Sequence, residues 1–248
     1  MNPLHILLLF AVGLVAGVLN VLAGGGSLLT LPVLLFLGLP APMANGTNRI
    51  AILAQNVVAV GGFRSRGKLP LKLALICTTP ALVGSVIGAR QAIEISDEAF
   101  RTILALVMLG VCVLMLIDPA RRLDFDTRPL TPSRITALIV TFFFVGLYGG
   151  FIQAGVGFLI ISGLLVHGLD LVRTNAVKVF VVLVYTAAAL AVFLWHGQVD
   201  WKLGLSLAAG NSLGGWVGTR LAISKGHAWI RRIVLAVVVL FALRLLWN

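Results

Sequence analysis

The chain alternates between long apolar runs and short links that are polar or rich in glycine. In the first half the apolar runs cover about 4–22, 27–39, 47–63, 70–90 and 99–117. In the second half they cover about 134–152, 157–169, 176–195, 201–221 and 229–247. Most of them approach the ~20 residues that a helix needs to cross the hydrocarbon core of a bilayer. The pattern predicts an all-α polytopic membrane protein with five hydrophobic segments in each half.

Two of the apolar runs, 27–39 and 157–169, are too short to cross a bilayer as helices. Each follows a break that contains glycine, Ala23-Gly24-Gly25-Gly26-Ser27 in the first half and Gln153-Ala154-Gly155-Val156-Gly157 in the second. The first two segments of each half either both cross the membrane or form a re-entrant hairpin. In either case the chain returns to the side on which it started.

The second half of the chain repeats the first. Residues 131–248 align with residues 1–118 at a constant shift of 130, and about two dozen of roughly 118 pairs are identical. The matches include Gly25 with Gly155, Asn45 with Asn175, Gly84 with Gly214, Gly88 with Gly218 and Arg90 with Arg220. Matched polar residues in one ungapped register indicate a duplication. The expected organisation is a first repeat at 1–118, a connector at 119–133 and a second repeat at 134–248.

Equivalent links of the two repeats carry opposite charge patterns. The link after the third segment holds Arg64, Arg66, Lys68 and Lys72, whereas its counterpart holds only Lys202. The next link mixes Arg90 and Arg101 with Glu94, Asp97 and Glu98, whereas its counterpart holds Arg220, Lys225, Arg231 and Arg232. Because basic loops stay on the cytoplasmic side, equivalent loops should lie on opposite sides of the membrane. The pattern therefore predicts inverted repeats with a cytoplasmic connector and both termini outside.

Composition agrees with a membrane protein and excludes several other classes. With 60% hydrophobic residues, 11% charged residues and a mean hydropathy of +1.08, a water-soluble domain is excluded. The net charge of +11 lies mainly in short loops, so membrane orientation explains it and nucleic acid is not an expected partner. Lipid is. Assembly with a second copy of the chain stays open.

Enzymatic chemistry has little support in the sequence. No Asp or Glu lies inside an apolar run, which argues against a proton relay of carboxylates or a cation site. Cys77 and Cys112 belong to no CxxC or Cys/His group, so neither a metal site nor a disulfide is expected. No GxxxxGK[ST] motif is present, so the chain has no ATPase of its own. We expect neither catalytic residues nor a cofactor.

The two glycine breaks are the first candidates for a binding site. Glycine lets backbone N–H groups approach an anion closely, and helix N-termini at Ser27 and Gly157 would direct positive dipole ends toward it. The alternative is that the glycines only allow tight helix packing. The candidate residues from the breaks are Gly24, Gly25, Gly26, Ser27, Gln153, Gly155 and Gly157.

The start of the third segment of each repeat supplies further candidates. These residues are Asn45, Thr47 and Asn48 in the first repeat and Asn175 and Lys178 in the second. Asn45 and Asn175 could instead be helix caps. Lys178 is equivalent to Asn48, and its ammonium could either neutralise an anionic substrate or extend to the cytoplasmic interface.

Two stretches carry a resemblance to a known family. The first is Gly13-Leu-Val-Ala-Gly17-Val-Leu-Asn20-Val-Leu-Ala-Gly24-Gly-Gly26-Ser-Leu-Leu-Thr-Leu-Pro32, followed by Ala44-Asn45-Gly46-Thr47-Asn48. The second is Gly146-Leu-Tyr148-Gly149-Gly150-Phe-Ile-Gln153-Ala-Gly155-Val-Gly157-Phe-Leu, followed by Thr174-Asn175-Ala176-Val177-Lys178. With these paired motifs the chain resembles the TauE/SafE family of sulfite exporter-like permeases over nearly its whole length. Ser162 in place of the first repeat's Pro32, and Gln153-Ala154 in the second break, depart from the pattern.

The resemblance implies a permease of the bacterial cytoplasmic membrane that moves small sulfur-containing anions such as sulfite, sulfoacetate or other organosulfonates, often as an exporter. Combined with the repeats, it favours alternating access around a central anion site between the two glycine breaks. Two alternatives stay open. One is a passive small-anion channel that uses the same breaks as a filter, and the other is a membrane-embedded enzyme or a structural subunit of a larger complex.

Overall fold

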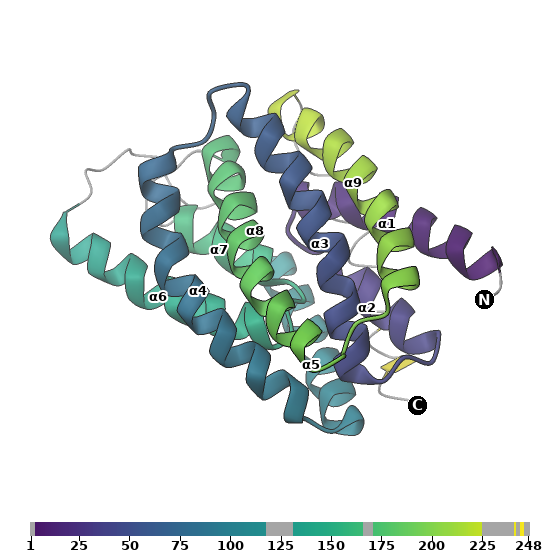
Figure 1. Ribbon diagram of the computed structural model, residues 1–248. Helices are drawn as coiled ribbons and strands as arrows, with labels where there is room; N and C mark the ends of the chain where they lie inside the picture. The colour runs from purple at the N-terminus through teal and green to yellow at the C-terminus, as the bar shows by residue number, and fades with distance from the viewer. Residues whose placement is uncertain (1–2, 118–130, 166–170, 225–240, 242–243, 246–248) are drawn as a thin grey trace.

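The computed structural model describes residues 3–117, 131–165, 171–224, 241 and 244–245. The regular structure of this part of the chain is α-helical (Figure 1). The helices are α1 (Pro3–Leu22), α2 (Ser27–Phe36), α3 (Ala41–Arg64), α4 (Leu71–Glu94), α5 (Asp97–Ile117), α6 (Pro132–Phe151), α7 (Val156–Leu165), α8 (Leu171–Trp195) and α9 (Trp201–Ser224). They correspond in order to the first nine expected segments. Most of the expected tenth segment, 229–247, and most of the 119–133 connector lie outside the described residues.

The third helix of each half begins earlier than the sequence suggested, and this corrects one interpretation. Helix α3 begins at Ala41 rather than near 47, and α8 begins at Leu171 rather than near 176. A proline precedes α3, and the Ala41 N–H donates to Asp97 Oδ1 at 2.9 Å. Asn45 and Asn175 therefore lie inside their helices and are fully buried, and the interpretation of them as helix caps was wrong.

Helix length separates membrane-spanning elements from shorter ones. Among the described residues, α1, α4, α6 and α8 are long and apolar enough to cross a bilayer. Helices α2 and α7 have 10 residues each, which at ~1.5 Å per residue extends over about half of the ~30 Å hydrocarbon core. The expected breaks before these two short helices are confirmed.

The long helices form a row in which the two halves of the chain interleave. Helices α3 and α8 are antiparallel at its centre, since Gly46 near the start of α3 lies against Gln198 just after α8. Helix α9 packs on α3 and α1, and α4 packs on α8 and α6. The loop after α3 and the loop after α8 lie at opposite ends of these two central helices, one at the top and one at the bottom of the view (Figure 1).

Glycines bring the interleaved helices into backbone contact. Gly13 and Gly17 of α1 lie against the α9 backbone near Asn211, and Gly84 and Gly88 of α4 lie against the α6 backbone near Leu147. Small residues allow this approach, which replaces the hydrophobic driving force that is missing between helices in lipid. Residue numbers rise together along both pairs, so α1 runs parallel to α9 and α4 runs parallel to α6.

The loops after α3 and α8 are built from the same turn. Gly67 and Gly197, which are equivalent in the repeat, have φ values of 64° and 67°. The Gly67 N–H donates to Arg64 O and the Lys68 N–H to Phe63 O, and the corresponding residues of the second half make the same two bonds. This is the Schellman ending of a helix, for which glycine is the favoured residue.

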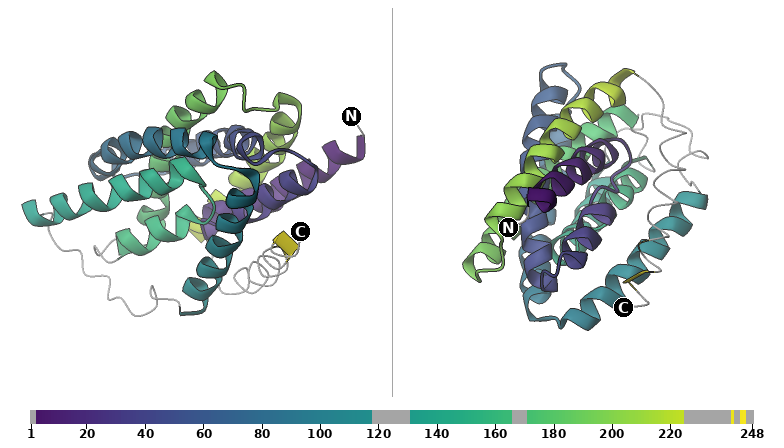
Figure 2. Two further views of the ribbon diagram at one scale, coloured as in Figure 1. Left: turned by 90° about the horizontal axis from the view of Figure 1, so that it is seen from below. Right: turned by 90° about the vertical axis from the view of Figure 1, so that its right-hand side faces the viewer.

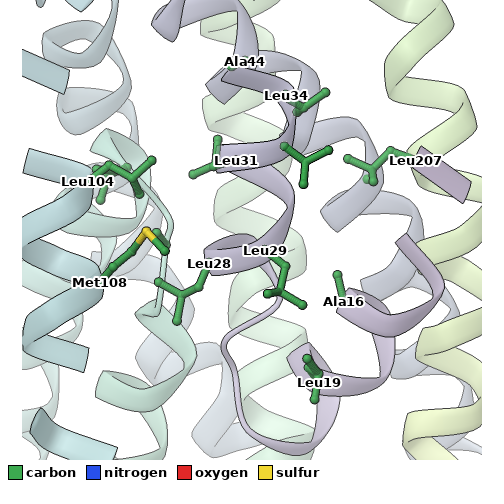
Figure 3. Packing of buried hydrophobic residues seen from close by; sticks show 14 of the residues in the cluster. Ala16, Leu19, Leu28, Leu29, Leu31, Leu34, Ala44, Leu104, Met108 and Leu207 are labelled. Carbon is green, nitrogen blue, oxygen red and sulfur yellow. The ribbon is translucent and has the colours of Figure 1, made fainter. Parts of the chain in front are cut away.

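The short helix α2 is buried between the row and α5. Leu28 and Leu31 point toward Leu104 and Met108 of α5, whereas Leu29 faces Ala16 (Figure 3). Helices α2 and α7 lie on one face of the row, and α5 lies on their far side (Figure 2). This places the two glycine breaks in the interior of the molecule.

Candidate functional site

The two glycine breaks meet backbone to backbone. A Cβ atom added at Gly24 would overlap Gly157 Cα, and one added at Gly157 would overlap Gly24 Cα. Gly24 and Gly155 have φ values of 85° and 70°, and Gln153 has a φ of 60°, which is uncommon for a residue with a side chain. The N-terminal ends of α2 and α7 are therefore next to each other, as the two breaks in the sequence suggested.

A small polar cavity lies beside this contact. Its volume is about 10 Å³, which is room for about one water molecule. It is lined by Asn20, Ser27, Ile52, Asn56, Gln153, Val156, Gly157, Lys178 and Val182. Two pairs of these residues are equivalent in the repeat, Ser27 with Gly157 and Ile52 with Val182. The cavity thus lies where the same positions of the two halves face each other.

Lys178 carries the charge at the cavity, and it does not extend to the membrane surface. Its side chain is 2% exposed. The ammonium donates to Asn20 O at 2.9 Å, Val21 O at 2.8 Å and Asn175 Oδ1 at 2.8 Å. These acceptors use all three N–H bonds of the ammonium. The first two belong to the C-terminal end of α1, where a cation complements the helix dipole.

Arg49 makes the equivalent arrangement at the end of α6. The guanidinium donates through Nη1 to Gly149 O at 3.1 Å and Gln153 Oε1 at 3.0 Å, and through Nη2 to Gly150 O and to Asn45 Oδ1 at 3.3 Å. It also lies 4.8 Å from the centre of the Phe193 ring. The side chain is fully buried but does not line the cavity.

The charge balance of this region favours an anion. Every acceptor that the described residues offer Lys178 and Arg49 is a carbonyl or amide oxygen, so no carboxylate neutralises either cation. The first backbone N–H groups to donate a hydrogen bond in α2 and α7 are those of Leu28 and Phe158. The N–H groups of Ser27 and Gly157, one residue earlier, make no such bond within the described residues. They remain available at two positive helix ends. A buried cation beside two free amides is suited to a small oxyanion.

Comparison with known proteins identifies the family of this chain. A model of the protein family described as "Sulfite exporter TauE/SafE" matches residues 9–245, nearly the whole chain. The chain belongs to the TauE/SafE family. It is accordingly a membrane transporter, as the resemblance of its two motif stretches predicted.

Similar proteins from several bacteria carry the same general description. A "Probable membrane transporter protein ORF9" of Sinorhizobium sp is 30% identical over 96% of this chain and 91% of its own length. A "Probable membrane transporter protein" of Haemophilus influenzae is 27% identical over 97% and 94%, respectively. A "Probable membrane transporter protein YfcA" of Escherichia coli K12 is 27% identical over 100% and 91%. These similarities extend across both halves of the TauE/SafE chain.

The structure brings four of the predicted site residues to the cavity of this TauE/SafE protein. These are Ser27, Gln153, Gly157 and Lys178. Asn20, Ile52, Asn56, Val156 and Val182 also line the cavity.

The other predicted residues lie nearby and have structural partners. The Asp200 N–H donates to Thr47 Oγ1 at 2.9 Å, and the Thr30 hydroxyl donates to Asn48 Oδ1 at 2.6 Å. Asn45 Nδ2 donates to Phe151 O at 2.7 Å. Gly25, Gly26 and Gly155 pack closely against neighbouring groups. Gly24 contacts Gly157, and Asn175 holds the Lys178 ammonium.

Arg49 is the residue that sequence reasoning missed. In the ungapped register it aligns with Val179, so the repeat gives it no charged counterpart at the equivalent position. The structure shows that its counterpart is Lys178, one position away. Arg49 is four residues after Asn45, and Lys178 is three residues after Asn175, and both spacings put side chains on one face of a helix. Comparing helix faces instead of exact positions would have revealed the pair.

Proposed function

We propose that this protein moves small sulfur-containing anions, such as sulfite, sulfoacetate or another organosulfonate, across the bacterial cytoplasmic membrane by alternating access, as an exporter. The observation that carries the proposal is the cavity that Lys178 lines together with Ser27 and Gly157, whose backbone N–H groups make no backbone hydrogen bond within the described residues. Sulfite and sulfonate groups present several oxygens to such donors. Cation, helix ends and amides together would replace the water that the anion loses.

The arrangement of the helices supports inverted repeats as the basis of this movement. The row contains the same contacts twice with the halves exchanged, α1 on α9 and α6 on α4, α3 on α9 and α8 on α4. Turns with the same hydrogen bonds end α3 and α8 on opposite sides of the bundle, at the top and bottom of Figure 1. On this proposal the two repeats have opposite orientations, the connector is cytoplasmic and both termini are outside.

The size of the cavity supports a site that opens and closes. A volume of about 10 Å³ accepts one water, whereas sulfite has four heavy atoms. The surrounding helices must therefore separate before an anion enters. An occluded central site between two related halves is what alternating access requires at one stage of its cycle.

Transport in proteoliposomes tests the proposal. We expect the purified protein to move sulfite or a small sulfonate with saturation and to exchange labelled anion against unlabelled anion across the membrane. Linear, non-saturating flux without such counterflow would instead identify a passive channel. If none of sulfite, thiosulfate, sulfoacetate and taurine moves or stabilises the protein, the proposed substrate class is wrong.

A further inference from the structure

We propose that Arg49 is a positioning residue that holds the Gln153 side chain as one wall of the cavity without contacting the transported anion. The identity of the anion rests on the function proposed above, whereas the role of Arg49 in holding Gln153 does not depend on it. Arg49 is therefore given a role that differs from that of Lys178, although the two cations occupy corresponding places.

The correspondence between the two cations is detailed. Arg49 binds Asn45 and the carbonyls that end α6, and Lys178 binds Asn175 and the carbonyls that end α1. Asn45 and Asn175 are equivalent in the repeat, as are Gly150 and Asn20, whose carbonyl oxygens are acceptors. Each cation thus connects a central helix of one half to the C-terminal end of a helix from the other half, just before the glycine break.

The two cations differ in what lies between them and the cavity. The Lys178 side chain lines the cavity itself, whereas Gln153 lines it in front of Arg49. The arginine Nη1 that binds Gly149 O also donates to Gln153 Oε1 at 3.0 Å. Arg49 is thereby connected to the cavity through one glutamine side chain.

Gln153 is held from two sides in an unusual backbone conformation. Its Oε1 accepts from Arg49, and its Nε2 donates to Thr186 Oγ1 at 2.7 Å. Its φ of 60° is one that residues with side chains adopt only where the surroundings determine it. A residue fixed at backbone and at both ends of its amide is well suited to define a wall. Without Arg49 the side-chain oxygen of Gln153, Oε1, loses its hydrogen bond to the guanidinium, so the side chain should move.

Chemical accessibility of the cavity tests this assignment without any substrate. In a chain carrying Cys77→Ala and Cys112→Ala, a Ser27→Cys substitution places one thiol on the cavity wall. Arg49→Lys keeps the charge but loses the forked geometry, and it should raise the rate of modification by a small water-soluble methanethiosulfonate about five-fold. Gln153→Gly suits the positive φ and should give a similar increase.

Combining the two substitutions separates positioning from a general structural role. If Arg49 acts through Gln153, Arg49→Lys in the Gln153→Gly background should add less than about two-fold to the modification rate. Rates that multiply, or an unchanged rate in Arg49→Lys alone, would overturn the assignment. The matched control is Arg64→Lys, an exposed arginine at the end of the same helix, which should leave the rate unchanged.

A shorter amide provides a second route to the same answer. Gln153→Asn leaves Arg49 in place and tolerates a positive φ, but its side chain is too short to reach the guanidinium. It should raise the modification rate as Gln153→Gly does, and a wild-type rate would contradict the proposal even if Arg49→Lys fails to fold.

Transport kinetics extend the test to the substrate. Arg49→Lys should raise the anion concentration that gives half-maximal transport about ten-fold, and much less when Gln153 is already glycine. If the wild-type protein moves no anion, the proposed function fails, whereas the thiol measurements still decide the role of Arg49.

Discussion

At the scale of single residues, the cavity is lined by Lys178 together with Ser27, Gln153 and Gly157 from the two glycine breaks. Lys178 stood out because it is a cation inside an apolar run, and the structure places it at the cavity. Ser27, Gln153 and Gly157 were found from the glycine breaks. Asn20, Ile52 and Val182 could not be predicted as cavity residues. Ile52 and Val182 are apolar and Asn20 is an isolated polar residue, and neither pattern indicates which face of a helix points toward the cavity in a bundle. Arg49 was missed because its structural counterpart, Lys178, lies one position before the residue with which the repeat aligns it.

Replacing Lys178 should separate its charge from its hydrogen bonds. Lys178→Met removes the hydrogen bonds to Asn20 O, Val21 O and Asn175 Oδ1 together with the cavity charge, so anion transport should fall to less than about a tenth of wild type. Lys178→Arg keeps the charge and should retain a measurable part of the activity. Lys202→Met, at an exposed lysine, is the control and should transport normally. Full transport by Lys178→Met would exclude a role in anion binding.

The contact between the breaks makes a second prediction about single residues. Gly24→Ala introduces a Cβ at a φ of 85° and against the Gly157 backbone, which should cost more than about 2 kcal/mol of stability. Gly61→Ala on α3 has open space around its Cβ and should stabilise the helix by about 0.5–1 kcal/mol. Melting temperatures in detergent measure both. Equal effects would show that the breaks do not depend on this close contact.

At the scale of helices, the hydrophobic pattern predicted the order and type of every described element, and it misplaced the ends where polar residues enter a helix. The runs expected at 47–63 and 176–195 begin earlier because Asn45, Asn175 and their neighbours are buried polar residues rather than loop residues. Hydropathy cannot distinguish these two cases. The contacts between helices were also beyond the pattern, since they depend on backbone approach at particular glycines.

Equivalent glycines should not be equally sensitive to substitution. A Cβ at Gly88 would overlap Leu147 O of α6, whereas the nearest atoms to a Cβ at Gly218 are in Val18 of α1, at 3.1 Å. Gly88→Ala should therefore lower the melting temperature more than Gly218→Ala does, since its Cβ would come within 2.0 Å of a backbone atom instead of 3.1 Å. Gly110→Ala on α5, which has open space around it, serves as the control. The reverse order would show that the α4–α6 contact is looser than described.

At the scale of the whole molecule, the sequence predicted a duplication, and the described helices contain the α1–α9 and α3–α9 contacts a second time as α6–α4 and α8–α4, on either side of the single α3–α8 contact. The opposite orientation of the two repeats in the membrane was inferred from loop charges. These charges indicate on which side of the membrane a loop lies, and they do not indicate how the helices pack. What the sequence could not show is that the halves interleave. Close packing pairs α1 with α9 and α4 with α6, so neither half forms a separate body.

Labelling of single cysteines tests the orientation. Ser65 and His196 are exposed residues in the loops after α3 and α8. In intact cells lacking the native cysteines, a membrane-impermeant thiol reagent should modify His196→Cys from outside and reach Ser65→Cys only after the cells are opened. Modification of both from the same side would contradict inverted repeats.

Interleaving also makes a prediction for the halves as separate chains. Expressed alone, residues 1–118 lack the α6 and α9 surfaces against which α4 and α1 pack, so this fragment should be degraded or aggregate. Expressed together, 1–118 and 131–248 should copurify. A stable monomer of either fragment would contradict the described packing.

The same interleaving constrains how such a protein could have originated. Because the glycine surface of α4 is covered by the first helix of the other repeat, a single repeat has no way to cover it within its own chain. A half-length ancestor would therefore have needed a second copy, and that copy would have had to enter the membrane upside down. On the proposed inverted orientation, fusion of two such genes would join a dual-topology dimer into one chain, in which the two cations could diverge into a lysine and an arginine. We expect a repeat made identical in both halves, with its loop charges balanced, to assemble as an antiparallel homodimer, and crosslinking of equivalent loops in one orientation only would contradict this history.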